Sequence, residues 1–272
     1  MTAATLSHNG YTLLPAPPLA QAIHTLQRRF GPEVIGHLRP MPPVVIPTGF
    51  PALDEALGIG GLPRGRIVDI YGPDSSGKST LCLHVIAQAQ RQGGTALFID
   101  VEHGLDLVWA RHCGVDTEAL YVSQPDNAEI AFEIVAAMAW AGISLIVIDS
   151  AAALTPRAEV ETDMGDHHPG LMAGLMSQAL RKLTGPLDRG QTLLLLTNQL
   201  RSQAAAAHLP DAPTGGRALR HYTAIQLELR PERLLRQSGN VVGRRIRATV
   251  TKSKVAPPYR TASLDIWHEA AR

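Results

Sequence analysis

Cysteine is scarce in this chain of 272 residues, which contains only Cys82 and Cys113. Two cysteines are too few for a disulfide framework or a zinc knuckle, and neither is expected to bind a metal. No stretch reaches the ~18 uninterrupted apolar residues that a membrane-spanning helix needs. No Lys or Arg precedes the short apolar run within residues 1–20, as a secretory signal would require. These absences predict a cytoplasmic protein in a reducing compartment that does not associate with membranes.

Charge is nearly balanced overall but unevenly distributed along the chain. The net charge is +1, yet residues 98–188 sum to −10 and residues 217–260 sum to +9. The basic segment is compatible with a phosphate-facing surface, a subunit contact or a solvated strand face, and charge alone does not choose among them. With 45% hydrophobic and 18% charged residues, the chain is expected to bury a sizeable core. This composition excludes disordered, collagen-like and coiled-coil proteins.

The first part of the chain has a composition of its own. Residues 1–18 carry no charge and end in prolines, which predicts a flexible lead. Apolar residues at helical spacing predict an amphipathic helix over Leu19–Phe30, terminated by a Gly-Pro pair. A proline-rich connector follows, so we divide the chain into an arm, residues 1–47, and a core, residues 48–272.

Short apolar strands and helices alternate in the core. The predicted strands are residues 66–71, 96–101, 120–123, 145–149 and 192–197. The predicted helices are residues 78–92, 106–113, 127–142 and 170–184. This alternation predicts an α/β fold with a mainly parallel sheet covered by helices on both faces. Three later strands, at 224–229, 245–252 and 263–267, have no long helix between them and predict an antiparallel extension of the sheet.

A phosphate-binding loop is the strongest motif. Residues 72–79 read Gly-Pro-Asp-Ser-Ser-Gly-Lys-Ser between a predicted strand and a predicted helix, and they match the pattern G-x-x-x-x-G-K-[ST]. The backbone N–H groups and the helix N-terminus suit phosphates, Lys78 can reach the terminal phosphates, and Ser79 offers a hydroxyl to Mg²⁺. The alternative, a chance glycine-rich turn, does not require this context. The motif therefore predicts binding of a nucleoside triphosphate.

Polar residues follow three of the other predicted strands. Asp149 ends an apolar strand and can complete the Mg²⁺ site with Ser79. Glu102 follows the strand 96–101, which we expect one strand away from the phosphate loop, where a carboxylate can activate a water molecule; capping a helix or pairing with a cation is the alternative. Gln199 follows the strand 192–197 and can sense a γ-phosphate.

Several segments together resemble the bacterial RecA recombinase family. They are the phosphate loop and residues 98–103, 149–156, 176–183 and 198–201, and the resemblance extends from about Leu19 to about Trp267. It implies a RecA-like P-loop ATPase core, with the helix Leu19–Phe30 as a polymerisation arm. It also implies ATP and Mg²⁺ as cofactors and a homo-oligomeric filament on single-stranded DNA. Duplex DNA would bind more weakly, and DNA-repair proteins would be further partners.

The resemblance also implies roles for individual residues. Glu102, Lys78 and Gln199 would be catalytic, and Trp109 would stack on adenine unless it is an ordinary core residue. The ATP-binding residues would be Gly72, Pro73, Asp74, Ser75, Ser76, Gly77, Lys78, Ser79, Thr80, Asp106, Trp109, Asp149, Lys252 and Lys254. Ser79 and Asp149 would hold the metal, and Lys252 and Lys254 would reach the ATP of a neighbouring subunit. The DNA-binding residues would be Arg157, Ser177, Arg181, Arg201, Thr214, Gly215, Gly216 and Arg217, in or beside loops at about 157–169 and 200–216.

The sequence departs from the family at several functional positions. An alanine run, residues 204–207, replaces the glycines and the aromatic residue of the second loop. Gly174 stands where the family has a DNA-contacting arginine, Pro169 alters the end of the first loop, and His221 replaces an aromatic residue that transmits the ATP state between subunits. The chain ends at Arg272, whereas typical members continue into a small C-terminal lobe that gathers duplex DNA. We therefore expect weaker DNA binding and altered cooperativity.

Three functions remain compatible with these features. The first is an ATP-dependent, single-stranded-DNA-binding recombinase for homologous recombination and DNA repair, favoured by the intact set of catalytic and ATP-binding residues. The second is a non-recombinogenic adaptor that binds ATP and acts in the DNA-damage (SOS) response or in translesion synthesis, favoured by the altered DNA loops. The third is a helicase or another ATPase of the wider class. ATP hydrolysis with and without single-stranded DNA separates the first two.

Overall fold

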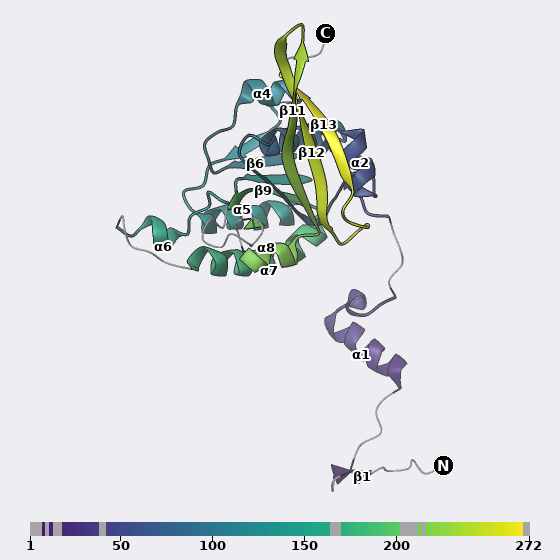
Figure 1. Ribbon diagram of the computed structural model, residues 1–272. Coiled ribbons are helices and arrows are strands. Elements are labelled where there is room, and N and C mark those ends of the chain that lie inside the picture. The colour runs from purple at the N-terminus through teal and green to yellow at the C-terminus, as the bar shows by residue number, and fades with distance from the viewer. Residues whose placement is uncertain are drawn as a thin grey trace. The chain divides into compact units, whose positions relative to one another are not determined.

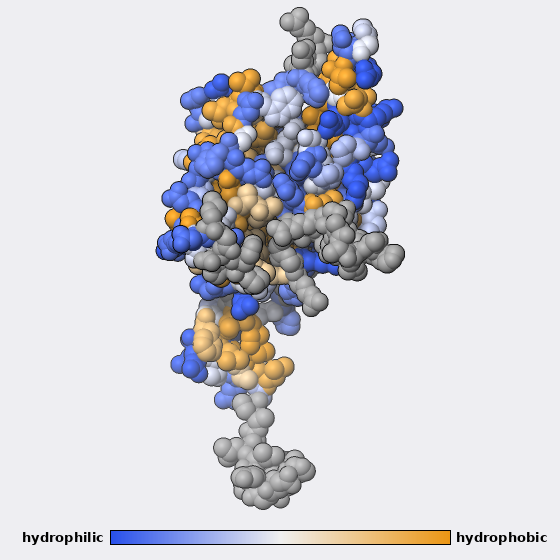
Figure 2. All heavy atoms as spheres, turned by 60° about the vertical axis from the view of Figure 1, so that its left-hand side comes forward, coloured by the Kyte–Doolittle hydropathy of each residue, from blue (hydrophilic) through white to orange (hydrophobic). Residues whose placement is uncertain are grey.

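The computed structural model describes residues 7–8, 11–12, 18–37, 42–163, 170–201, 212–213 and 216–268, in two compact units, residues 1–42 and 43–272. In the first unit, β1 (Ser7–His8) pairs with β2 (Tyr11–Thr12), and α1 (Leu19–Phe30) precedes a short 3-10 helix (Pro32–Val34). Helix α1 has the predicted bounds and no buried residue. Hydrophobic side chains gather along it in Figure 2, and its end residues are 77% and 58% exposed. Its own unit therefore leaves the apolar side of α1 uncovered.

The second unit is built on one large sheet (Figure 1). Its strands, in order across the sheet, are β13 (Thr261–Trp267), β12 (Asn240–Ser253), β11 (Ile225–Gln237), β5 (Ile67–Gly72), β9 (Leu193–Arg201), β8 (Leu145–Asp149), β6 (Ala96–Asp100) and β7 (Tyr121–Ser123). All neighbours from β11 to β7 are parallel, whereas β12 and β13 are antiparallel. The α/β fold with a mainly parallel sheet and an antiparallel C-terminal part is confirmed. Because β11 still pairs in parallel with β5, the antiparallel extension begins one strand later than expected.

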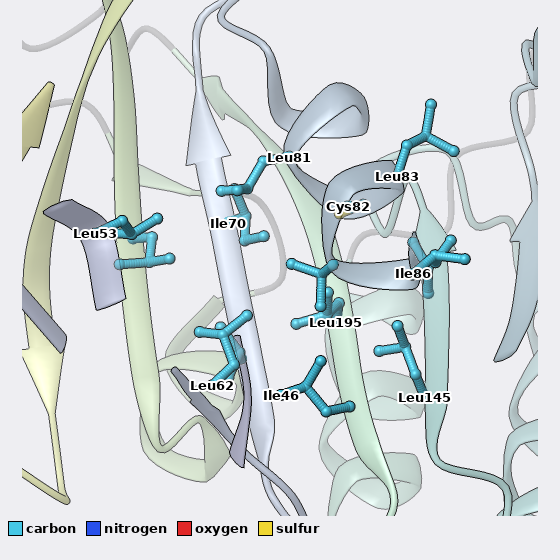
Figure 3. Close-up of a cluster of buried hydrophobic side chains, with 14 of the residues drawn as sticks. Ile46, Leu53, Leu62, Ile70, Leu81, Cys82, Leu83, Ile86, Leu145 and Leu195 are labelled. Atoms are coloured by element: carbon cyan, nitrogen blue, oxygen red, sulfur yellow. The ribbon is translucent and has the colours of Figure 1, made fainter. Parts of the chain in front are cut away.

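Helices cover both faces of this sheet, as predicted. On one face lie α2 (Pro51–Leu57), α3 (Lys78–Arg91) and α4 (Leu107–His112), and on the other lie α5 (Ala128–Trp140), α7 (Leu171–Gly190) and α8 (Gly216–Tyr222). Alternate residues of each central strand enter the two apolar clusters, which explains why these strands read as continuous apolar runs. Figure 3 shows Leu81 and Ile86 of α3 in the cluster with Ile70 of β5 and Leu195 of β9.

Both cysteines are buried and free. Cys82 belongs to α3 in the same cluster, and Cys113 follows α4. Burial raises the pKa of both thiols, that of Cys113 to about 11. Both are therefore residues of the apolar core.

A long hairpin leaves the sheet at its antiparallel side. Strands β11 and β12 extend well beyond the predicted 224–229 and 245–252 and project together from the body (Figure 1). Ser238 and Gly239, in the turn, have φ of 50° and 86°, as a two-residue hairpin turn requires. Most side chains beyond residue 229 of β11 are exposed. Because this part of the hairpin has no buried face, its sequence does not alternate between apolar and polar residues. The strands predicted from apolar residues were therefore shorter than the observed ones.

Smaller elements complete the core. Strand β3 (Val45–Ile46) pairs with β4 (Leu62–Pro63), and β10 (Ala212–Pro213) pairs with the end of β9, which runs past the predicted residue 197. Helix α6 (Arg157–Val160) lies in the predicted first DNA loop, and α7 continues through Pro186 to Gly190. No helix in the part of the chain that the structure describes is long and apolar enough to span a membrane.

Candidate functional site

The phosphate loop connects β5 to α3 in the predicted context. Gly77 has φ of 86° immediately before α3 begins at Lys78, a left-handed conformation that glycine adopts at little cost. Position 72 requires glycine for another reason, because a Cβ there would lie 2.2 Å from the carbonyl oxygen of Leu229. The loop is thus packed tightly against β11, and its backbone N–H groups lie at the N-terminus of a 14-residue helix.

Two side chains of the loop fit an anionic ligand. Lys78 Nζ donates to the carbonyl oxygens of Pro73 (2.9 Å) and Gly72 (3.2 Å). Burial lowers the pKa of Lys78, while the nearby charges of Asp74, Asp149 and Glu102 oppose this shift. Ser76 Oγ is the one buried side-chain polar atom without a partner among the described residues. Because an unpaired buried hydroxyl is costly, its position inside the loop suits a bound phosphate.

Asp149 and Ser79 lie together at the end of β8. The carboxylate accepts hydrogen bonds from the Ser79 hydroxyl and from Thr197 Oγ1, the latter at 2.5 Å. Burial raises the pKa of Asp149, and these hydrogen bonds and Lys78 act against the shift. A hydroxyl and a carboxylate are the oxygen donors that Mg²⁺ takes alongside phosphates and waters. Within the described ranges no group of three His, Cys, Asp or Glu residues could hold a metal by itself.

Glu102 lies near Asp149 because of a strand order and a contact that the sequence did not indicate. Our expectation that the strand before Glu102 lies one strand away from the phosphate loop was wrong, because β9 and β8 both lie between β5 and β6. The hydroxyl of Ser150 donates to Oε1 of Glu102, and the backbone N–H of Val101 donates to the carbonyl oxygen of Asp149 at 2.9 Å. The negative charge of Glu102 also acts to raise the pKa of both Lys78 and Asp149. Sequence reasoning missed Ser150, whose one signal is its place directly after Asp149.

Gln199 lies inside β9, not after it. In the parallel ladder it is the partner of Gly72, the first residue of the phosphate loop. Its backbone N–H donates to Oδ1 of Asn198 at 3.1 Å, and its side chain is exposed. The register therefore places this amide beside the loop because β9 is the immediate neighbour of β5.

Three of the predicted ATP-binding residues, Thr80, Asp106 and Trp109, also come together. Trp109 Nε1 donates to Thr80 Oγ1 at 3.2 Å, and the indole stacks on His112 with ring centroids 4.7 Å apart. Asp106 caps α4, since its Oδ1 accepts from the N–H groups of Val108 and Trp109. Trp109 is half-buried and packs against the apolar core. It thus has both a structural role and a position next to the helix that follows the phosphate loop.

Lys252 and Lys254 lie away from the phosphate loop of their own chain. Lys252 is the ladder partner of Gln226, which is level with Asp69, three residues before Gly72. Its ammonium donates to the carbonyl oxygens of Thr223, at 2.7 Å, and Arg220. Burial, Lys254 and Arg220 lower the pKa of Lys252 to about 8.

The second lysine has a similar partner. Lys254 Nζ donates to the carbonyl oxygen of His221 at 2.7 Å. Both ammonium groups therefore satisfy carbonyls at the C-terminal end of α8, where a helix favours positive charge.

The predicted DNA residues are only partly described. Ser177 and Arg181 lie one turn apart on α7, and Arg157 begins α6 with its N–H donating to Glu129 Oε2 at 2.9 Å. Gly216 begins α8. Residues 164–169, 202–211, Thr214 and Gly215 lie outside the described residues, and so do the side chains of Arg201 and Arg217.

Comparisons with known proteins agree with this geometry. The RecA N-terminal domain family matches residues 18–271. The chain is 50% identical over 256 residues to protein RecA of Heliobacterium modesticaldum, which covers 92% of this chain and 74% of that protein. It is 52% identical over 253 residues to protein RecA of Clavibacter michiganensis subsp. michiganensis, covering 91% and 70%. Protein RecA of Cutibacterium acnes is 51% identical over 253 residues, covering 91% and 73%. The chain therefore belongs to the RecA family and is a homologue of the RecA recombinase.

Proposed function

We propose that this chain is an ATP-dependent, single-stranded-DNA-binding recombinase that forms filaments for homologous recombination and DNA repair in the cytoplasm. One observation carries the proposal. In a chain that belongs to the RecA family, the charges of Lys78, Asp149 and Glu102 lie close enough at the end of the parallel strands to interact electrostatically. Parallel sheets bind ligands at this edge. The chain is accordingly a DNA-dependent ATPase.

The phosphate loop binds ATP in this proposal. Its backbone N–H groups and Ser76 hold the phosphates, and Lys78 exchanges its contacts with loop carbonyls for the terminal phosphates. Mg²⁺, when bound through Ser79 and Asp149, neutralises phosphate charge. The indole of Trp109, with Thr80 and Asp106 beside it, receives the adenine.

Hydrolysis depends on Glu102. Its carboxylate takes a proton from the attacking water as a general base. Because Ser150 occupies Oε1, we assign the water to Oε2. Gln199 lies beside Gly72 and senses the γ-phosphate, and β9 continues from it to Arg201, where the second DNA loop begins. Loss of the phosphate is thereby transmitted to DNA along one strand.

The active site is completed between subunits. Lys252 lies level with Asp69 in its own chain, and Lys254 lies two residues further from the phosphate loop, so we assign both lysines to the ATP of the neighbour. The arm, residues 1–47, carries the uncovered apolar side of α1 and packs on the adjacent subunit. Hydrolysis then requires a filament, and DNA-repair proteins act on that assembly.

Single-stranded DNA binds along α7 and the two loops. Arg157, Ser177, Arg181, Arg201 and the segment from Thr214 to Arg217 supply the contacts, chiefly to phosphate. Gly174 on α7 is exposed and has no side chain with which to contact phosphate. This missing contact favours the second candidate, an ATP-binding adaptor that does not exchange strands.

The steady-state ATPase rate with and without a long single-stranded DNA tests the proposal. We expect strong stimulation by DNA that falls as salt is raised from low to moderate concentration, because phosphate contacts release counterions. A rate that DNA does not change, in a chain that still binds ATP, would contradict the recombinase function and support the adaptor. A chain that binds no ATP would contradict the assignment of the phosphate loop.

A further inference from the structure

Strand β12 carries three arginines within four residues, and two of them have carboxylate partners. Arg245 makes a bidentate pair with Asp265, with both N–O distances 2.6 Å, and Arg247 Nη2 lies 2.7 Å from Glu232 Oε1. Arg244 makes no ion pair within 4.0 Å with any carboxylate of the described residues. Because successive side chains of a strand point to opposite faces, Arg244 lies on the face opposite to both pairs.

Arg244 instead reaches the phosphate loop. Its Nη1 donates to the backbone carbonyl oxygen of Ser75 at 2.6 Å, across 169 residues of sequence. Ile246 shares this face of β12, and a Cβ on Gly77 would lie 2.4 Å from its Cδ1. These two contacts place β12 directly against the loop, so the position of Arg244 is set by packing as well as by one hydrogen bond.

The peptide that Arg244 holds has an uncommon backbone conformation. Ser75 has φ of 56°, which is unfavourable for a residue with a Cβ. The N–H of the same peptide group, from Ser76, donates to the carbonyl oxygen of Pro73 at 3.3 Å. The peptide is therefore held at its carbonyl by the guanidinium and at its N–H by the loop itself. Its orientation matters because phosphates bind to the N–H groups of such loops.

The guanidinium also changes the charge that an anion would meet. Carbonyl oxygens carry partial negative charge, and Lys78 already binds those of Gly72 and Pro73. Arg244 does the same for Ser75, so three carbonyls of the loop are each contacted by a cation. Arg244 is half-buried, and its hydrogen bond to Ser75 lies at the exposed surface of the loop, so salt should weaken the effect of its charge.

We propose that Arg244 is a positioning residue of the nucleotide site, which holds the Ser75 peptide and favours the binding of nucleoside diphosphates and triphosphates. The inference rests on the proposed binding of ATP by the phosphate loop. The contact is to the loop and not to the reacting γ-phosphate. It therefore stabilises the bound substrate and the transition state equally, which changes KM and leaves kcat unchanged.

Four proteins test this role: the wild type, Arg244→Ala, Arg244→Lys and Arg247→Ala. The last removes the same charge three residues along the strand, on the opposite face. Titration with ATP and with ADP should give dissociation constants about tenfold higher for Arg244→Ala, the loss typical of one charge-assisted hydrogen bond. Arg244→Lys should recover part of the loss, and Arg247→Ala should stay within twofold of the wild type. With single-stranded DNA, the KM for ATP of Arg244→Ala should rise about tenfold while kcat stays within twofold.

The outcomes separate this proposal from the function it rests on. If Arg244→Ala binds ATP and ADP within twofold of the wild type, or if Arg247→Ala loses as much affinity, the proposal is wrong. A wild type that binds no ATP would instead refute the phosphate-loop assignment. Thermal unfolding without nucleotide checks that each variant is folded. If Arg244→Ala does not fold, Arg244→Gln takes its place, with the same expected loss and the same twofold limit.

Discussion

Gln226 Nε2 donates to Asp69 Oδ2 at 3.0 Å, and both side chains are buried between β11 and β5. Asn198 Nδ2 approaches the other carboxylate oxygen at 3.5 Å. Burial raises the pKa of Asp69 to about 7, although Gln226, Asn198 and Lys252 oppose the shift. Neutral amides stabilise a buried carboxylate less well than a cation in contact would, so Asp69 keeps a high affinity for its proton.

Asp69→Asn should flatten the pH dependence of stability. The pKa of Asp69 is raised on folding, so its contribution is fully present below the unfolded pKa of about 3.8 and is lost as the pH rises to about 7. Between pH 5 and pH 8 the wild type should lose about 3 kcal/mol of unfolding free energy through this group, and the variant should not. Urea unfolding at several pH values measures the difference. The exposed Asp163→Asn is the control, and parallel curves for wild type and Asp69→Asn would contradict the prediction.

Glu102→Gln should bind ATP normally and hydrolyse it poorly. The amide keeps the size of the side chain and its contact with Ser150, but it cannot accept a proton from water. We expect kcat to fall by about a hundredfold or more, with the dissociation constant for ATP within twofold of the wild type. Glu118→Gln, at an exposed position, is the control. A kcat within tenfold of the wild type would show that Glu102 is not the general base.

Lys252→Ala should bind ATP but hydrolyse it slowly even with single-stranded DNA, because Lys252 does not lie at the phosphate loop of its own chain. Normal turnover would show that one subunit contains the whole site. A mixture with Lys78→Ala makes the test sharper, since a Lys78→Ala subunit retains Lys252 and can complete the intact phosphate loop of its neighbour. The mixture should therefore hydrolyse ATP faster than either variant alone. Arg260→Ala is the matched control for the lost charge.

Gly174→Arg should strengthen binding to single-stranded DNA. The position is exposed on α7, one turn before Ser177, and open space surrounds it. One added phosphate contact should steepen the slope of log K against log salt concentration by about 0.7. Gly185→Arg adds the same charge near the other end of α7, where nothing lies within 4 Å either. If both variants gain equal affinity, the effect is one of net charge and not of a contact at Gly174.

Substitution by alanine should have opposite effects on stability at two glycines of α7. A Cβ on Gly190 would lie 1.9 Å from the carbonyl oxygen of Ala139, whereas Gly174 is exposed and has nothing within 4 Å of its Cβ position. Gly190→Ala should lower the unfolding free energy by about 2 kcal/mol or more, and Gly174→Ala should raise it by about 0.5–1 kcal/mol. Denaturant unfolding measures both. Gly190→Ala as stable as the wild type would show that the end of α7 shifts freely away from α5.

The strands with buried faces were predictable because their signals are local. Five of the six strands of the parallel part, all except β11, were placed to within two residues at nearly every end. Four of these five are buried, which requires continuous apolar runs, whereas β7 is a largely exposed edge strand. The projecting part of the β11–β12 hairpin has no such requirement. Its length was therefore missed, although Ser238 and Gly239 have the backbone conformation of a tight hairpin turn.

The amino-acid sequence by itself determined the phosphate loop, the position of Asp149 and the alternation of strands and helices, because each depends on residues that are near one another in the chain. Only the tertiary structure decided which strands are neighbours. The order β5, β9, β8, β6 places Gln199 beside Gly72 and moves Glu102 further along the sheet, where Ser150 contacts it. The contact of Arg244 with Ser75 spans 169 residues. Contacts of this kind follow from strand order and packing, which no local pattern of residue types encodes.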